Sequence, residues 1–321
     1  MTRLAVDLLG ADTDERELCR GAVQALKQNG ELFLYLCGHR DAIEQVLTAE
    51  NAPRERLEVV DSPVALTNSD DPMQGYTNAD ASMVKAMTLV QGGQAAGIVT
   101  CGATGCVLVS SIMLIGKLRG LRPILAVELK NEQGEPLLLL DCGANIDSRP
   151  DLYPCFTKLG DAYMRCIGKT KPRISLLSNG TEDEKGCEAV KEANRLLRAL
   201  PIGFLGNIEP TEALSGKTDV IVCDGFHGNL LLKSIEGVAK TVIRQLTARL
   251  QSPNAETKQA LEQIYRDYDF NAQGGAILLG VKAPVMKGHG AANGDAVTAM
   301  LTRMTDLVAN GFIDRVRTAC V

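Results

Sequence analysis

The sequence of 321 residues contains no tryptophan, and its aromatic residues together make up only 4%. Proteins that bind nucleic acids commonly stack bases on aromatic side chains and present a basic surface. This chain has a formal net charge of −5 instead. The composition therefore argues against both features, and we expect no nucleic acid among the partners of this protein.

Long apolar runs and export signals are also missing. The first residues, MTRLAVDLLGAD, contain neither an apolar signal core nor a cleavage site, which is untypical of an exported protein. A transmembrane helix requires a run of about 18 apolar residues, and the sequence contains no such uninterrupted run. We therefore expect a cytoplasmic protein, with peripheral attachment to the inner face of the membrane as an open alternative.

Zinc-binding patterns are absent, although cysteine is frequent. The sequence has 10 cysteines and 3 histidines, and no two cysteines have the C-x-x-C spacing that is typical of zinc sites. We expect no metal site, and reduced, mostly buried thiols. Four thiols adjoin glycine-rich segments, where a transient acyl-cysteine is an alternative interpretation: Cys101, Cys106, Cys142 and Cys223.

Short aliphatic runs that are typical of buried strands alternate with amphipathic segments that are typical of helices. The expected strands are Leu4–Leu8, Leu32–Cys37, Leu57–Asp61, Gly97–Thr100, Ile124–Leu129, Leu137–Asp141, Arg173–Ser178, Ile202–Leu205, Val220–Cys223 and Ala276–Val281. The expected helices include Glu15–Gln28, Asp80–Gln91, Gly105–Leu118, Glu182–Leu200 and Asp295–Asn310. This alternation predicts an α/β fold, with a doubly wound, mostly parallel sheet and helices on both faces. The chain length suits one large domain or two lobes, and we expect a single domain over residues 1–321.

The segment Gly228–Asp269 differs from the rest of the chain. Its pattern predicts two polar helices that are joined at QSPNAE, with Pro253 as the break. We expect this helical pair to protrude from the domain as an insertion over about residues 234–270. Its narrow apolar stripe lacks tryptophan and phenylalanine, which favours a packing or dimer face over a lipid anchor. The stripe consists of Val238, Ile243, Leu246 and Leu250.

Glycine is the residue in excess, with 31 copies against a usual frequency of about 7%. The glycines concentrate in six segments near the ends of expected strands: Leu8–Asp12, Thr100–Gly105, Asp141–Asn145, Ser178–Gly186, Cys223–Asn229 and Lys287–Gly294. Ligands of open α/β sheets bind beyond the carboxyl ends of the strands, and glycine lets backbone N–H groups approach an anion. We predict that the six segments form one cleft for a phosphate or an oxyanion. Ordinary turns that need glycine are the alternative for each segment.

Polar side chains accompany these glycines. Lys185 is a stronger candidate than an ordinary surface lysine, because its segment is bounded by glycines and precedes an expected helix. His227 and His289 are candidate acid–base groups, with a hydrogen-bonded loop histidine as the alternative. The residues expected to bind phosphate or substrate are Gly10, Asp12, Gly102, Thr104, Gly105, Gly143, Asn145, Gly180, Gly225, Gly228, Gly290 and Asn293.

In this order, the segments resemble the PlsX family, the acyl-[acyl-carrier-protein]:phosphate acyltransferases of bacterial phospholipid synthesis. The resemblance covers nearly the whole chain, and its most specific stretches are Leu137–Asp147, Gly216–Gly237 and Gly274–Asn293. It implies a fold like that of phosphotransacetylases and of isocitrate and isopropylmalate dehydrogenases. It also implies a reaction without a cofactor, in which inorganic phosphate attacks the acyl thioester of acyl-carrier protein.

The resemblance also implies roles for three residues. Lys185 matches the loop lysine of the family and would hold phosphate or the developing oxyanion. Asn229 matches the asparagine that ends the D-G-F-x-G-N motif and would be a further donor. His289 would donate to phosphate or protonate the leaving thiolate. A homodimer is implied as well, and weak contact with a membrane or with an enzyme of the acyl-glycerol-phosphate pathway stays open.

Three segments depart from the family pattern: residues 9–12, 76–79 and 101–106. Ala103 stands where the family commonly has asparagine, and residues 72–83 contain no basic side chain where relatives often carry several. Two alternatives therefore remain, namely a short-chain acyl-CoA phosphotransacylase and a degenerate, non-catalytic relative that binds acyl carrier. The basic residues of the helical pair would meet the acidic carrier protein or simply form a solvated face. They are Lys240, Arg244, Arg249, Lys258 and Arg266.

Overall fold

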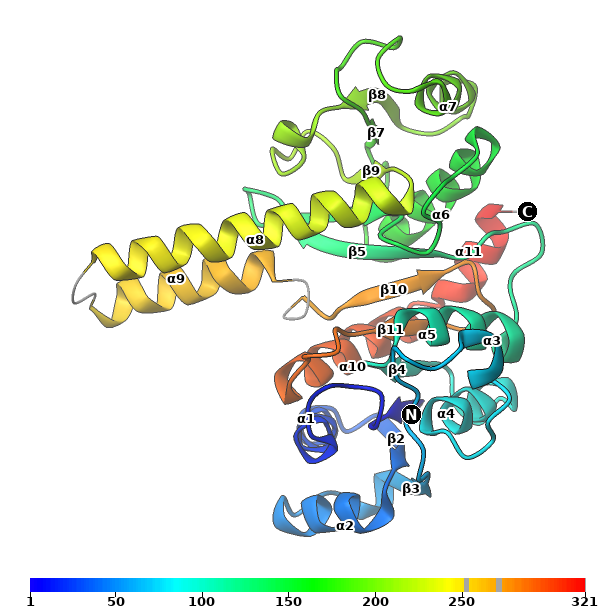
Figure 1. The fold of residues 1–321 in the computed structure, drawn as a ribbon, viewed down its shortest axis with the longest axis vertical. Helices are drawn as coiled ribbons and strands as arrows, with labels where there is room; N and C mark the ends of the chain where they lie inside the picture. Colours follow the sequence, from blue (N-terminus) through cyan, green and yellow to red (C-terminus); the bar gives the residue numbers. More distant parts are fainter. Residues whose placement is uncertain (251–253, 270–272, 321) are drawn as a thin grey trace. The chain divides into compact units, whose positions relative to one another are not determined.

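The computed structural model describes residues 1–250, 254–269 and 273–320 of the protein, and it divides the chain into two compact units (Figure 1). Unit 1 comprises Met1–Pro123 and Gly274–Ala319, and unit 2 comprises Ile124–Gln273. Each unit contains strands and helices. The single domain over residues 1–321 stays a prediction.

The strands of unit 1 form the order β3-β2-β1-β4-β11-β10. They are β1 (Thr2–Asp7), β2 (Leu32–Gly38), β3 (Leu57–Asp61), β4 (Ile98–Thr100), β10 (Ala276–Leu279) and β11 (Val285–Lys287). The helices are α1 (Glu15–Gln28), α2 (Arg40–Ala49), α3 (Pro72–Gly75), α4 (Ser82–Gln91), α5 (Thr104–Ser110), α10 (Gly294–Ala309) and α11 (Phe312–Cys320). All neighbouring strands in this part are parallel, except that β10 and β11 are antiparallel.

The strands of unit 2 form the order β5-β6-β9-β7-β8. They are β5 (Ile124–Lys130), β6 (Pro136–Leu140), β7 (Ile174–Leu177), β8 (Phe204–Ile208) and β9 (Val220–Val222). The helices are α6 (Tyr153–Cys166), α7 (Glu188–Arg198), α8 (Gly225–Arg249) and α9 (Ala255–Tyr268). Only β5 and β6 are antiparallel, so the predicted mostly parallel α/β arrangement is confirmed.

The aliphatic runs form strands because they can be buried on both faces. In β6, for example, Leu137, Leu138, Leu139 and Leu140 are each at most 1% exposed. Consecutive buried side chains point to opposite faces of a strand, so both faces of the sheet are covered here. Each such leucine contributes about 1.5–3 kcal/mol by leaving water.

Two expected helix boundaries need correction, and one strand has no counterpart among the expected strands. The helix expected over Glu182–Leu200 begins only at Glu188, because residues 182–187 form turns. The helix expected over Gly105–Leu118 ends as an α-helix at Ser110 and continues as a π-helical turn, Ser111–Ile115. Strand β11 was not expected, because three residues after Pro284 are too few for a periodic signal.

Helices α8 and α9 form the helical pair that the sequence predicts, and they run side by side in Figure 1. The pair begins earlier than residue 234, because α8 starts at Gly225, directly after strand β9. The expected break at Pro253 lies outside the described residues. Among the described residues, no helix is long and apolar enough to cross a membrane.

Candidate functional site

Three neighbouring strands of unit 2 end in glycine-rich segments. Strands β6, β9 and β7 lie side by side and run parallel. Their carboxyl ends are followed by Asp141–Asn145, Cys223–Asn229 and Ser178–Gly186, respectively. Because carboxyl ends of parallel strands share one edge of a sheet, the topology gathers three of the six predicted segments there.

Unit 1 gathers the other three segments in the same way. Strands β1, β4 and β11 are parallel neighbours, and Leu8–Asp12, Thr100–Gly105 and Lys287–Gly294 follow them. The last segment follows β11 and not the strand expected over Ala276–Val281, which corrects that expectation. One cleft formed by all six segments stays a prediction.

A buried carboxylate, that of Asp141, organises the edge in unit 2. The side chain is fully buried and accepts five hydrogen bonds of 2.7–3.1 Å. The donors are the backbone N–H groups of Leu125, Gly143, Ala144 and Asn145 and the side-chain amide of Asn145. Burial raises the pKa of Asp141, although these donors oppose the shift. The amide of Asn145 therefore serves to order its own segment.

The first turn of helix α8 packs directly on that ordered segment. The N–H of Gly225 donates to the carbonyl oxygen of Asn145 at 2.7 Å. A Cβ on Gly228 would lie 1.9 Å from the carbonyl oxygen of Asp141, and real contacts are never so short. Two predicted ligand-binding glycines, Gly225 and Gly228, thus permit the close approach of two backbones.

A second buried carboxylate, that of Asp7, organises the edge in unit 1. It accepts hydrogen bonds from the hydroxyl groups of Ser82 at 2.5 Å and Thr100 at 2.7 Å. Burial raises the pKa of Asp7, and these bonds partly oppose the shift. A Cβ on Gly10 would lie 2.6 Å from the Cα of Gly102, so these two segments also touch through their glycines.

The other candidates of unit 1 are placed as follows. The backbone N–H of Asp12 donates to the carbonyl oxygen of Gly290 at 2.7 Å. Asn293 caps helix α10 with its side-chain oxygen. His289 is exposed, and its Nδ1 accepts a hydrogen bond from a backbone N–H two residues later. Thr104 and Gly105 are exposed in the first turn of α5.

A cavity of about 610 Å³ lies in unit 2, beside the ends of β7 and β9. Its polar residues are Ser178, Asn179, Cys187, His227 and Ser234, and its apolar wall includes Leu177, Pro210, Leu230 and Leu231. The hydroxyl of Ser178 is buried and has no hydrogen-bond partner among the described residues. Buried polar groups are ordinarily paired, so this one suits a ligand or water in the cavity.

Two sequence-predicted residues of unit 2, Lys185 and Asn229, do not line this cavity, but each adjoins lining residues in the chain. Lys185 precedes two lining residues, Gly186 and Cys187, and Asn229 precedes the lining residue Leu230. Both side chains are exposed, and neither makes a hydrogen bond or ion pair within the described part of the chain. The Cγ of Lys185 lies against Gly180, since a Cβ there would come within 2.6 Å of it.

Sequence reasoning predicted the segment Ser178–Gly186 as part of the cleft, but it did not single out Ser178 or Cys187 as lining residues. Ser178 and Asn179 have a signal, because they begin the glycine-rich segment after strand β7. Cys187 had none, whereas the four cysteines that were singled out are all buried. Burial raises the pKa of all four, to about 12 for Cys101, so the acyl-cysteine alternative is disfavoured at those positions. The prediction that most thiols are buried is confirmed for the described residues.

A second cavity of about 640 Å³ continues from the first along helix α8. The two share Pro210, Leu231 and Ser234, and the second is lined mainly by apolar side chains of α8 and α9. These include Val238, Val242 and Ile264. A mainly apolar surface therefore continues from the first cavity along α8.

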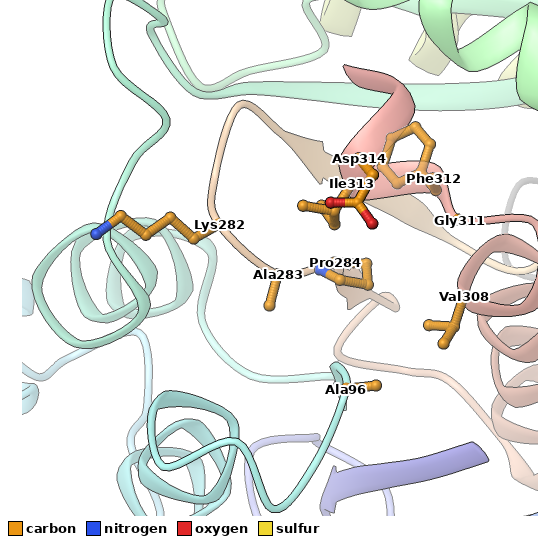
Figure 2. A pocket seen from close by; sticks show the side chains of 9 residues that line it. All are labelled: Ala96, Lys282, Ala283, Pro284, Val308, Gly311, Phe312, Ile313 and Asp314. Atoms are coloured by element: carbon orange, nitrogen blue, oxygen red, sulfur yellow. The ribbon is translucent and has the colours of Figure 1, made fainter. Parts of the chain in front are cut away.

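A smaller cavity in unit 1, of about 190 Å³, lies away from the glycine-rich segments (Figure 2). It is lined by Ala96 and Pro284, which precede strands β4 and β11, and by residues around the start of α11. It therefore lies at the amino ends of strands whose carboxyl ends bear the glycines. No cluster of three or more metal-ligating side chains is found within the described residues.

Comparisons with known proteins agree with this arrangement. A family model described as fatty acid synthesis protein matches residues 2–315. A phosphate acyltransferase of Clostridium acetobutylicum is 31% identical, over 98% of this chain and 97% of that protein. A phosphate acyltransferase of Bacillus mycoides is 33% identical, over 97% of this chain and 96% of that protein.

Solved structures share the fold. A phosphotransacetylase from Streptococcus pyogenes has a TM-score of 0.63 at 15% identity, covering 96% of this chain and 94% of that one. A branched-chain phosphotransacylase from Enterococcus faecalis has a TM-score of 0.62 at 17% identity, covering 96% and 99%. A 4-hydroxythreonine-4-phosphate dehydrogenase from Klebsiella pneumoniae has a TM-score of 0.56 at 14% identity, covering 95% and 99%. The predicted fold class is confirmed.

Helix α8 packs closely on the segment after β6 at one of its glycines but not at another. Replacing each of these two glycines by alanine should therefore change the free energy of unfolding in opposite directions. Gly228→Ala should lower the free energy of unfolding by more than about 2 kcal/mol, because backbone must move. Gly237→Ala should raise it by about 0.5–1 kcal/mol, because nothing lies within 4 Å of the added methyl group and alanine favours helix. Urea denaturation of both variants checks this, and equal effects would contradict the packing.

Proposed function

The chain belongs to the fatty acid synthesis protein family, and from this premise we propose that it is a phosphate acyltransferase. It moves a fatty acyl group from acyl-carrier protein to inorganic phosphate, which gives acyl phosphate for phospholipid synthesis. Relatives of that name match over nearly the full chain. The observation that supports this proposal is a cavity with polar residues at the strand ends and apolar residues beyond them. Lys185 and Asn229, whose side chains are unpaired, are neighbours of its lining residues in the chain.

The polar end of the cavity suits the phosphate and the thioester carbonyl. Phosphate is already a nucleophile at neutral pH, so positioning and charge stabilisation are the main requirements. The ammonium of Lys185 makes no ion pair within the described residues and would bind the phosphate dianion. Asn229 and the unpaired hydroxyl of Ser178 would donate to phosphate or to the oxyanion that forms on the carbonyl. No cofactor is required for this chemistry.

The apolar wall suits a long acyl chain. Leu177, Leu230 and Leu231 line the first cavity, and the second extends the apolar surface to Val238 and Val242. Each methylene group that leaves water contributes about 0.8 kcal/mol. A long-chain acyl group would thus be bound in preference to an acetyl group, which favours a fatty acyl donor over short-chain acyl-CoA.

The exposed face of α8 suits protein partners. Lys240, Arg244 and Arg249 make no ion pair within the described residues, and we propose that they bind the acidic carrier protein. Val238 is 63% exposed. A second copy of the chain that covered this face would shield the acyl chain from water, which accords with the expected homodimer. We propose that the enzyme works in the cytoplasm.

Removing either unpaired donor should slow the reaction. We expect Lys185→Ala and Asn229→Ala each to lower turnover by about 10²-fold or more, the usual effect of losing one oxyanion donor. Phosphate-dependent acyl phosphate, trapped with hydroxylamine, is the measurement. Lys191→Ala is the matched control, because this lysine is on nearby α7 and is paired with Glu188.

Near-wild-type turnover in both variants would refute the roles proposed for Lys185 and Asn229. If the wild-type protein yielded no phosphate-dependent product from any thioester between acetyl and stearoyl, the proposed function would be wrong. Measurable turnover would exclude the non-catalytic alternative.

A larger side chain in the apolar wall should slow the reaction of a long acyl chain but not that of a short one. Leu231→Trp should lower kcat/KM for palmitoyl-carrier protein by about tenfold or more, because the larger side chain occupies space that both cavities share. It should leave the slower reaction of acetyl-CoA unchanged. Leu205→Trp is the control, because Leu205 is 56% exposed on β8 and lines neither cavity. Faster wild-type turnover of acetyl-CoA than of the palmitoyl donor would favour the short-chain alternative.

Reversing the charge of basic residues on α8 should weaken the binding of acyl-carrier protein without affecting a small thioester substrate. We expect Lys240→Glu combined with Arg244→Glu to raise KM for palmitoyl-carrier protein by about tenfold and to reduce its dependence on salt. The small thioester palmitoyl-pantetheine should be unaffected, since it lacks the acidic protein. Arg195→Glu, on the surface of α7, serves as the control. Equal effects on both donors would show that α8 does not bind the carrier.

A further inference from the structure

We propose that Asp224 and His227 form a proton relay, and that His227 is a further catalytic residue which protonates the leaving thiolate. This inference rests on the proposed function, because the thiolate is the leaving group of that reaction. The family resemblance assigns no role to position 227, which is the variable position of the D-G-F-x-G-N motif.

The carboxylate of Asp224 holds both the imidazole and the backbone N–H of His227. Nδ1 of His227 lies 2.7 Å from Oδ2 and 2.9 Å from Oδ1 of Asp224. The backbone N–H of His227 also donates to Oδ1 of Asp224 at 2.8 Å, because Asp224 is the N-cap of helix α8. A carboxylate at Nδ1 favours the tautomer with a proton there, so Nε2 is left to exchange protons.

Nε2 of His227 is available for proton exchange. It has no hydrogen-bond partner within the part of the chain that the structure describes, and the imidazole lines the 610 Å³ cavity. The carboxylate of Asp224 is only 14% exposed, whereas the His227 side chain is 55% exposed. A shielded carboxylate that holds an accessible imidazole is the arrangement of an acid–base pair.

A second observation marks the same cavity as a ligand site. Ser178, on the segment after β7, is 8% exposed, and its hydroxyl has no partner among the described residues. It lines the same cavity as His227, although strands β7 and β9 bring the two residues there from different parts of the sequence. An unpaired buried hydroxyl and an oriented imidazole that line one cavity suit a polar reacting group bound there.

The proposed step balances without another reactant. The hydrogen phosphate dianion attacks the thioester carbonyl carbon through a charged oxygen, and a C–O bond forms. As the adduct collapses, the C–S bond breaks and its electron pair goes to sulfur. Nε2 of His227 takes the proton of the phosphate hydroxyl and delivers it to that sulfur. The products are the acyl phosphate dianion and a neutral thiol, and the imidazole returns to its neutral form.

The test compares two leaving groups in the full-length protein. With palmitoyl-pantetheine, whose alkyl thiolate is strongly basic, His227→Gln should lower kcat by about 10²–10⁴-fold. With the palmitoyl thioester of an aryl thiol, whose thiolate leaves without a proton, the same variant should lose less than about fivefold. Phosphate-dependent release of thiol is measured for both thioesters.

Two further variants test the role of Asp224 and provide a control. Asp224→Asn retains a helix cap but weakens the orientation of the imidazole, so it should show a smaller loss confined to the alkyl thioester. His39→Gln is the matched control, because His39 pairs with Glu15 at 3.0 Å in unit 1 and lines none of the cavities described above. It should leave both rates unchanged.

The outcomes of this test distinguish the proposed role of His227 from the proposed function of the protein. Equal losses of His227→Gln on both thioesters, or no loss on either, would overturn the relay while the enzyme remained an acyltransferase. Wild-type protein that released no thiol in a phosphate-dependent way from either thioester would overturn the proposed function, and the relay with it.

Discussion

The site in unit 2 depends on one buried carboxylate. Asp141 is removed from water at the end of β6, and a charge in that position requires hydrogen bonds from every side. The backbone of residues 143–145 supplies most of them and is thereby fixed. The first turn of α8 then rests on this segment through Gly225 and Gly228. The positions of His227 and Asn229 follow, because both lie in the turns that this contact places.

This dependence explains why the glycines are so concentrated. Backbone N–H groups converge on Asp141 only if neighbouring segments approach without intervening side chains. Gly10 and Gly102 meet in the same way beside Asp7 in unit 1. Part of the glycine excess therefore serves contact between protein segments and not contact with an anion. The anion-binding groups are better sought among exposed side chains that have no partner, such as the ammonium of Lys185.

Much of the fold follows from local sequence, whereas the cavity does not. Aliphatic runs such as Leu137–Leu140 predict strands, because burial on both faces leaves a continuous signal. Strand β11 has three residues, so its existence depends on pairing with β4 and β10 and not on its own pattern. The juxtaposition of Ser178 and His227 depends on the adjacency of β7 and β9, which are far apart in the chain. No spacing in the sequence encodes that adjacency.

The departures from the family pattern all lie in one of the two units, and this location shows which properties of the protein they affect. Residues 9–12, 76–79 and 101–106 all belong to unit 1. At one of them, Ala103 is the N-cap of α5 and offers no side-chain acceptor, whereas asparagine is among the best capping residues. The expected loss there is about 0.5–2 kcal/mol of local helix stability. In contrast, Lys185, Asn229, Ser178 and the apolar wall all belong to unit 2. The groups to which we assign the acyl chemistry are therefore separate in the chain from the positions that have changed, which favours a working enzyme over a degenerate one.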